Sequence, residues 1–194
     1  MSEVAAARRD PYHVLVSTII SLRTKDQVTI AASDRLFHRA PNALSLAAMA
    51  EDEIAALIYP AGFYRTKAKN LREIARRIVG DHGGLVPDTE EGLLALPGVG
   101  RKTANLVLGL GFSIPAICVD THVHRIPNRL GIIETKTPEQ TEEALKESLP
   151  REYWIDVNGL LVAFGQQVCT PVSPRCSRCP LSAACRRVGV ERSR

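Results

Sequence analysis

The stretch ALPGVGRKTANLVLGLGF, Ala95–Phe112, combines one proline, four glycines and two adjacent cations inside an otherwise amphipathic chain. One helix is expected to end at Leu96, and a second to begin at the two cations after a tight turn. Gly98 and Gly100 can take positive φ and allow close approach of the backbone. The free N–H groups of such a turn and of the following helix start, together with the helix dipole, suit a phosphate oxygen. The order of these features predicts a helix-hairpin-helix that binds a DNA backbone, with a purely structural turn as the alternative.

The rest of the chain also favours helices. Asp10-Pro11 and Thr137-Pro138 are N-cap residues followed by a proline at the first helical position. Leu71, Ile74 and Ile78 recur at helical spacing within residues 64–81. A run of alternating β-branched residues bounded by turns is missing from the sequence. These patterns predict an all-α fold of short helices with tight connections.

Composition limits the class of protein. The chain has 194 residues, of which 45% are hydrophobic and 24% charged, as expected for a soluble globular protein. It lacks an apolar run near the ~18 residues of a membrane span, and its first residues lack a signal-peptide core, so a cytoplasmic protein without membrane contact is expected. The net charge of +4 is weak evidence for a polyanionic partner.

Four of the five cysteines are clustered near the C-terminus: Cys169, Cys176, Cys179 and Cys185. In a cytosolic chain such a cluster favours a metal over disulfides, and four thiolates suit both zinc and an iron–sulfur cluster. From Cys169 to the end there are six arginines and one glutamate, which can offset thiolate charge or contact phosphates. Cys118 lies outside the cluster and is expected to be a small buried apolar residue.

Lys102 and Asp120 can each be interpreted in two ways, as a non-catalytic residue or as a catalytic one. Lys102 is either a surface cation near phosphate or a nucleophilic amine, and the second role needs its pKa lowered by about three units. Asp120, in the stretch ICVDTHVHR, fits the N-cap of a helix, and its apolar flank places the carboxylate at the rim of a buried segment. A lysine and an aspartate at two helix starts can line one cleft.

In LPGVGRKTAN, VDTH and the cysteine spacing, the chain resembles the endonuclease III family of helix-hairpin-helix DNA glycosylases, from about Asp10 to Cys185. The resemblance implies an all-α, two-domain enzyme. Residues 4–114 would form a six-helix domain with the helix-hairpin-helix, and residues 115–194 a domain with a [4Fe-4S] cluster. DNA would bind between the domains.

The resemblance also implies site residues. Lys102 matches the nucleophile that forms a Schiff base, and Asp120 matches the catalytic carboxylate. The four clustered cysteines match the ligands of the [4Fe-4S] cluster. Arg23 and Phe63 match residues that fill the hole left by the extruded nucleotide, and the implied DNA contacts as a whole are Arg23, Phe63, Leu96, Gly98, Val99, Gly100, Arg101 and Thr103.

The implied activity is that of a bifunctional DNA glycosylase and AP lyase of base excision repair. It would act as a monomer on double-stranded DNA with oxidised pyrimidines or abasic sites, in the cytoplasm at the nucleoid. One alternative is a monofunctional mismatch or adenine glycosylase, although Lys102 argues against it. Others are a non-catalytic DNA-binding module and an iron–sulfur electron carrier, which explain fewer of the motifs.

Three features depart from the family pattern. Arg23 stands where glutamine is expected, which affects the preference for the opposite base. Only about ten residues precede DPYHVL, so the N-terminal helix is expected to be shortened or missing. Pro127 would lie inside the helix that starts at Asp120, where it removes a hydrogen bond to the Val123 carbonyl and bends the helix.

Overall fold

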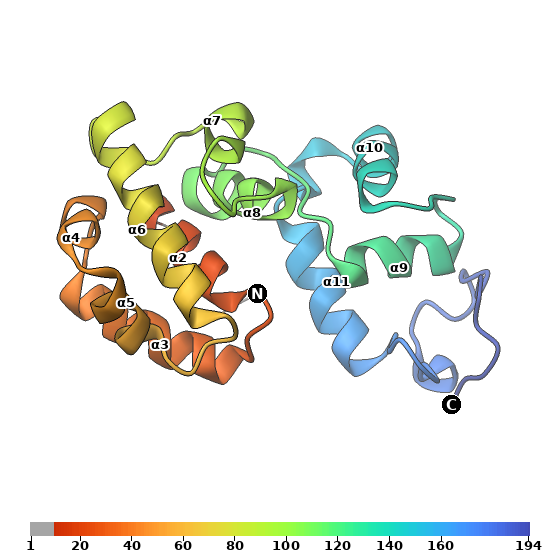
Figure 1. Cartoon of the computed structure of the whole chain (residues 1–194). Coiled ribbons are helices and arrows are strands. Elements are labelled where there is room, and N and C mark those ends of the chain that lie inside the picture. The colour runs from red at the N-terminus through yellow and green to blue at the C-terminus, as the bar shows by residue number, and fades with distance from the viewer. Residues whose placement is uncertain (1–9) are drawn as a thin grey trace. The chain divides into compact units, whose positions relative to one another are not determined.

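In the computed structural model, which describes residues 10–194, every regular element is a helix (Figure 1). The predicted all-α fold is therefore confirmed. The chain divides into two compact units, with the boundary between Ile114 and Pro115. The expectation of a shortened N-terminal helix concerns residues 1–9, which lie outside the described residues. None of the helices in the described part of the chain is long and apolar enough to cross a bilayer.

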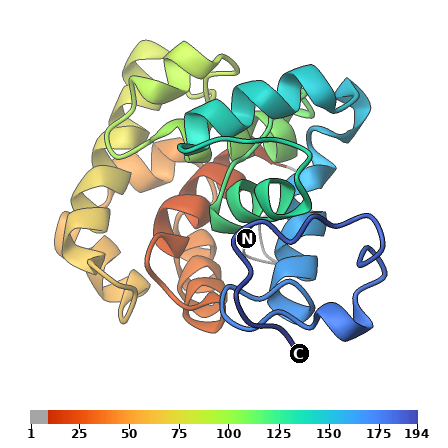
Figure 2. The same cartoon turned by 90° about the vertical axis from the view of Figure 1, so that its right-hand side faces the viewer.

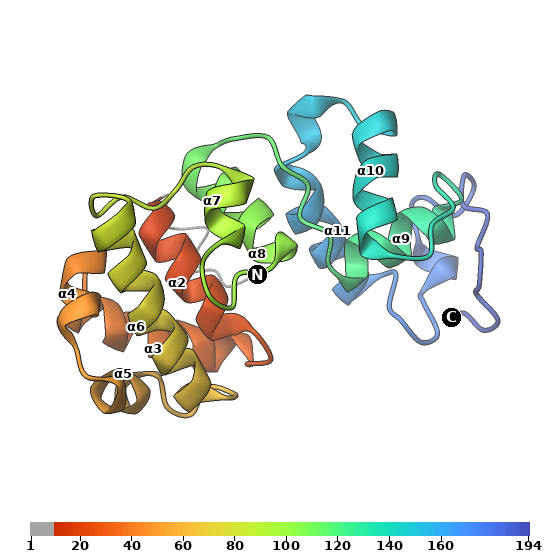
Figure 3. The ribbon, with the colours of Figure 1, turned by 45° about the horizontal axis from the view of Figure 1, so that its top comes forward.

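The first unit consists of short helices joined by tight turns. They are α2 (Pro11–Ser21), α3 (Asp26–Arg39), α4 (Ala43–Ala48), α5 (Glu51–Ile58), α6 (Tyr64–Asp81), α7 (Glu90–Leu94), α8 (Arg101–Leu106) and the π-helical η1 (Val107–Gly111). Helix α6 packs along α4 and α5, while α2 contacts α3, α6, α8 and η1 (Figures 1 and 3). Helix α2 is therefore the centre of the unit, and Val14, Leu15, Val16, Ile19 and Ile20 on it are at most 1% exposed.

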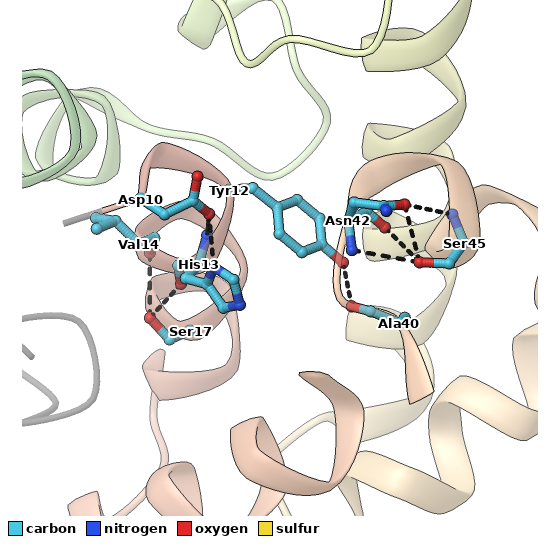
Figure 4. A network of polar contacts seen from close by, with 8 residues as sticks. All are labelled: Asp10, Tyr12, His13, Val14, Ser17, Ala40, Asn42 and Ser45. Carbon is cyan, nitrogen blue, oxygen red and sulfur yellow. Dashed lines mark hydrogen bonds and ion pairs between the residues drawn. The ribbon is translucent and has the colours of Figure 1, made fainter. Parts of the chain in front are cut away.

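Polar contacts determine where α2 begins and tie it to the start of α4 (Figure 4). The Asp10 carboxylate caps α2 by accepting a hydrogen bond of 3.0 Å from the His13 backbone N–H. The Tyr12 hydroxyl donates to the Ala40 carbonyl at 2.9 Å, and burial of this phenol raises the pKa of Tyr12. Asn42 then forms a capping box with Ser45 at the N-terminus of α4. The predicted Asp10-Pro11 start is thus confirmed.

The second unit has fewer helices and a smaller core. Its elements are α9 (Thr121–Leu130), α10 (Pro138–Ser148), the 3₁₀ turn η2 (Arg151–Tyr153), α11 (Asp156–Gln167) and the 3₁₀ turn η3 (Cys176–Arg178). Ile117, Val119, Val123, Ile133 and Leu145 form the buried cluster, against which Trp154 and Leu161 pack. Beyond α11 the chain runs through loops to the C-terminus, drawn in dark blue in Figure 2.

Two local features differ from expectation. Helix α7 ends at Leu94 rather than Leu96, because the Leu96 N–H bonds to the Leu93 carbonyl three residues back and no longer follows the α-helical pattern. The helix after the hairpin changes into a π-helix at Val107, which the sequence pattern did not predict. The N-cap expected at Thr137 is present, with its hydroxyl 3.3 Å from the Gln140 nitrogen. Thr89 caps α7 in the same way, with its hydroxyl 3.2 Å from the Gly92 nitrogen.

Candidate functional site

A tight turn of residues 95–100 joins α7 to α8 (Figure 3). Gly98 has φ +76°, and a Cβ there would lie 2.6 Å from Nδ2 of Asn70, so both conformation and space require glycine. The Val99 N–H closes the turn on the Leu96 carbonyl at 3.2 Å. Gly100 is the N-cap of α8 and supplies no side chain, so side-chain capping does not occupy the first N–H groups of that helix.

The hairpin residues divide into buried and exposed ones. The side chains of Leu96, Val99 and Thr103 are buried, so a DNA contact from these residues has to involve the backbone. Gly98 and Gly100 are exposed. Arg101 is exposed at the helix start and lies 3.5 Å from a carboxylate oxygen of Glu90 on α7. The exposed surface of the hairpin is therefore mainly backbone together with one paired arginine.

Lys102 and Asp120 lie at the starts of two helices, each in its own unit. Lys102 is the second residue of α8 and is exposed. Asp120 is the N-cap of α9, and its Oδ1 accepts bonds of 2.8 and 2.9 Å from the His122 and Val123 N–H groups. The capping role of Asp120 is thus confirmed, and Oδ2 lies outside the cap. The pairing of the two side chains stays a prediction.

Arg23 and Phe63 are 40 residues apart in sequence and lie together in the first unit. The Arg23 guanidinium carbon is 5.5 Å from the centre of the Phe63 ring, within the range of a cation–π contact. Both residues have positive φ, +53° and +56°, which is uncommon for side chains of this size. Phe63 is 65% exposed and therefore does not belong to the hydrophobic core.

All four clustered cysteines line one cavity in the second unit. Arg129 of α9 also lines it and donates to the Cys169 sulfur at 3.5 Å and to the Thr170 carbonyl at 2.7 Å. The Arg187 N–H donates to the Cys185 sulfur at 3.3 Å. Yet within residues 10–194 no group of three or more His, Cys, Asp or Glu side chains is arranged to hold a single ion. The thiols thus share a cavity without forming a compact single-ion site.

Two residues on α9 were missed by the sequence analysis. Arg125 donates to the Cys169 carbonyl at 2.8 Å, and burial, with nearby Arg129, lowers its pKa. Arg125 and Arg129 are spaced four residues apart on one face of α9, which is the signal that pairs them. They connect the helix that begins at Asp120 to the loop that begins at Cys169.

The other residues discussed above behave more simply. Cys118 is 3% exposed, as expected, and its carbonyl accepts a 3.0 Å bond from the Asn158 side chain. Helix α9 continues through Pro127 to Leu130 and ends at Gly131. The proline is therefore accommodated within the helix and does not terminate it.

A buried lysine was also missed. Lys67 of α6 is only 6% exposed. It lies four residues before Leu71, on the apolar face of that helix. Burial lowers the pKa of Lys67 from 10.5 to about 8. A cation on the apolar stripe of a helix was the available sequence signal.

Comparisons with known proteins agree with this geometry. Residues 16–151 match the model of the HhH-GPD superfamily of base excision DNA repair proteins. The chain is 51% identical to endonuclease III of Thermotoga maritima over 91% of its own length and 83% of that protein. It is also similar to solved structures: a trapped endonuclease III–DNA covalent intermediate (TM-score 0.87, 33% identity, 96% of this chain and 88% of the other) and a thermostable thymine-DNA glycosylase (TM-score 0.85, 29% identity, 94% and 86%).

Proposed function

Since the chain belongs to the HhH-GPD superfamily of base excision DNA repair proteins and is a homologue of endonuclease III, we propose that Lys102 and Asp120 carry its DNA glycosylase and AP lyase reactions. The enzyme removes a damaged base and then nicks the strand. Its proposed substrates are oxidised pyrimidines and abasic sites in double-stranded DNA. The observation that carries the assignment is the position of Lys102, exposed in the first turn of α8 directly after the hairpin.

In the proposed reaction the neutral Lys102 amine attacks C1′ of the damaged nucleotide. The new N–C1′ bond forms as the glycosidic bond breaks, and the base leaves with its bonding electrons and takes up a proton. Ring opening gives an iminium ion, the protonated Schiff base, between Lys102 and C1′. Loss of a proton from C2′ then expels the 3′ phosphate by β-elimination, and hydrolysis of the imine releases the lysine.

Asp120 is suited to stabilise positive charge in this reaction. Its Oδ1 holds the first N–H groups of α9, which fixes the carboxylate and leaves Oδ2 for a reacting group. It can accept the proton that Lys102 loses or stabilise the cationic sugar, and both roles need the same placement.

The hairpin and the Arg23–Phe63 pair are the proposed DNA contacts. Exposed backbone at Gly98 and Gly100 suits a phosphate without reading sequence. The extruded nucleotide leaves a hole in the base stack, and the exposed Phe63 ring can stack there. Arg23, held over this ring, offers a planar fork of donors to the orphaned base.

The C-terminal cysteines are proposed to hold a [4Fe-4S] cluster. Four thiolates also suit zinc, but the sequence spacing of these cysteines matches the cluster ligands of the endonuclease III family. All four line one cavity of the second unit, as a cluster bound by four cysteines requires. The cluster would cross-link the loops of residues 169–185, and Arg129 beside Cys169 would offset part of its negative charge. We place the enzyme, as a monomer, with the chromosomal DNA.

Borohydride trapping tests the proposal. The protein is incubated with a duplex that contains thymine glycol or an abasic site, borohydride is added, and the covalent complex is counted on a denaturing gel. We expect trapping by the wild type, its loss in Lys102→Ala, and its retention in Lys136→Ala, a control at an exposed lysine outside the proposed DNA contacts. Absence of a trapped species with both substrates would refute the lyase assignment.

The same assay separates the alternatives. A monofunctional mismatch glycosylase releases a base but forms no trapped complex, and a non-catalytic module only binds. For Asp120→Asn we expect DNA binding close to wild type and turnover greatly reduced. Equal loss of binding and turnover in this variant would mean that Asp120 serves only as a helix cap.

A further inference from the structure

Lys67 is buried, and no oppositely charged partner contacts it within residues 10–194. Its ammonium donates to the carbonyls of Ile20 and Leu22 at 2.7 and 2.5 Å and to the hydroxyl of Thr24 at 2.9 Å. All three partners are neutral oxygens, and desolvation is the one cause of its lowered pKa. A lysine that is buried in this way is costly for the fold, which raises the question of what its contacts accomplish.

The partners of Lys67 lie on the segment that carries Arg23. Leu22 and Thr24 are its two chain neighbours, so Lys67 holds the backbone carbonyl before Arg23 and the side-chain hydroxyl of the residue after it. Arg23 itself has positive φ, a conformation that persists only when its surroundings enforce it. The Lys67 ammonium supplies that constraint.

Thr24 extends the contact to the segment that carries Phe63. Its hydroxyl, which accepts from Lys67, also accepts a 3.1 Å bond from the Gly62 N–H, next to Phe63. A Cβ at Gly62 would lie 2.5 Å from the Arg23 carbonyl, so the two segments are in direct backbone contact. Phe63 also has positive φ, and its ring meets the Arg23 guanidinium on the exposed side.

We propose that Lys67, acting through Thr24, is a positioning residue that locks Arg23 and Phe63 into one preassembled wedge for entry into the DNA base stack. The proposal rests on the proposed glycosylase function, because the wedge has a task only when a nucleotide is extruded. Lys67 does not touch DNA, since it lies beneath the segment that presents the wedge. Preassembly removes the ordering of two exposed side chains from the cost of DNA binding.

The test separates positioning from general stability with three variants, one at Lys67 and a matched pair at Thr24. Lys67→Met removes the ammonium while keeping a long apolar chain. Thr24→Val removes the shared hydroxyl at nearly the same volume, and Thr24→Ser, its matched control, keeps the hydroxyl. If Lys67→Met does not fold, the comparison of Thr24→Val with Thr24→Ser decides.

Two substrates distinguish the wedge from the chemistry. One is a duplex with an abasic site opposite an intact strand, and the other lacks the nucleotide opposite the abasic site, so that no orphaned base has to be contacted. Trapping rates at Lys102 are measured on both. In addition, 2-aminopurine placed opposite a reduced abasic analogue reports, by its fluorescence, the unstacking caused by the wedge.

We expect Lys67→Met and Thr24→Val to trap the intact duplex about tenfold more slowly and to lose the fluorescence rise, because one buried hydrogen-bond partner is worth about that factor. On the gapped duplex they should stay within about twofold of wild type, and Thr24→Ser should match wild type on both. Wild-type rates on the intact duplex, or equal slowing on both substrates, would overturn the positioning role. A wild-type protein that traps neither substrate would instead refute the proposed function.

Discussion

The two units differ in what keeps their chains folded. In the first unit, α2 lies among α3, α6, α8 and η1, and its apolar side chains are almost fully buried. In the second, the apolar cluster is small, and Pro174 is the one buried residue between residues 166 and 194. Ordering a residue costs about 1–2 kcal/mol of backbone entropy, which this last segment cannot offset by apolar burial.

The comparison shows how one protein can use two means of fixing its chain. The first unit holds the hairpin and the turns that carry Arg23 and Phe63 between helices packed on a hydrophobic core. The C-terminal segment is fixed by backbone carbonyl contacts from Arg125 and Arg129 and, as proposed, by a cluster that joins four cysteines. Changes to the cysteines and changes to the core should therefore have different consequences.

Loss of one cluster ligand should have the largest effect. In Cys176→Ser we expect the iron–thiolate absorption to disappear and trypsin to cut at the arginines of residues 175–187, while the first unit stays resistant, because the C-terminal segment has no core of its own. Cys118→Ala is the control and should keep the absorption. A resistant C-terminal segment in Cys176→Ser would break the comparison.

Truncation of a core side chain should have the next largest effect, and its size should differ between the two units. Leu15→Ala in α2 removes a side chain that is 0% exposed, and it should destabilise the first unit by about 4 kcal/mol. Leu145→Ala, at 4% exposure in the smaller cluster, should cost about 2 kcal/mol. Urea unfolding followed by Trp154 fluorescence reports the second unit, because Trp154 is the one tryptophan, and far-UV circular dichroism reports both units. A Trp154 transition that responds to Leu15→Ala alone would contradict this assignment.

The buried lysine predicts a pH dependence confined to the first unit. The pKa of Lys67 falls from 10.5 to about 8 on folding, so the unfolded chain binds more protons between these values. Stability from this group therefore rises as pH increases from 8 to 10.5, by about 3 kcal/mol in total. Arg23 and Tyr59 are the titratable groups on the segments that contact it, residues 20–24 and 59–63.

The measurement is urea unfolding of wild type and Lys67→Met at several pH values, because the contributions of other groups cancel in the difference. The free energy of unfolding of wild type, relative to that of Lys67→Met, should increase as pH rises from 8 to 10.5. A difference that is flat, or that shrinks with rising pH, would show that the Lys67 amine is not desolvated in the folded state.

The hairpin should show the smallest change in stability. Gly98→Ala forces a methyl group against Asn70 at φ +76° and should cost about 1–2 kcal/mol and weaken DNA binding. Gly100→Ala has open space and φ −100°, so its stability should change by less than about 0.5 kcal/mol. Calorimetry of both variants and DNA titration at fixed salt check this. Equal costs for the two variants would remove the special role of Gly98.

Much of the local structure was predictable because its determinants are close in sequence. Asp10, Thr89, Asp120 and Thr137 cap their helices through backbone N–H groups two or three residues away. The π-helical turn at Val107 could not be foreseen, since it arises where α8 and η1 pack against α2 and not from a residue type.

The amino-acid sequence by itself determined the helical class, the place of the hairpin in the chain, and a set of four closely spaced thiols. Only the tertiary structure decided that Arg23 and Phe63 meet, that Lys67 lies buried beneath them, and that arginines of α9 reach the loop at Cys169. The physical reason is how far apart in sequence the interacting residues lie. Caps and turns depend on neighbours along the chain, whereas burial and desolvation depend on which distant segments pack together.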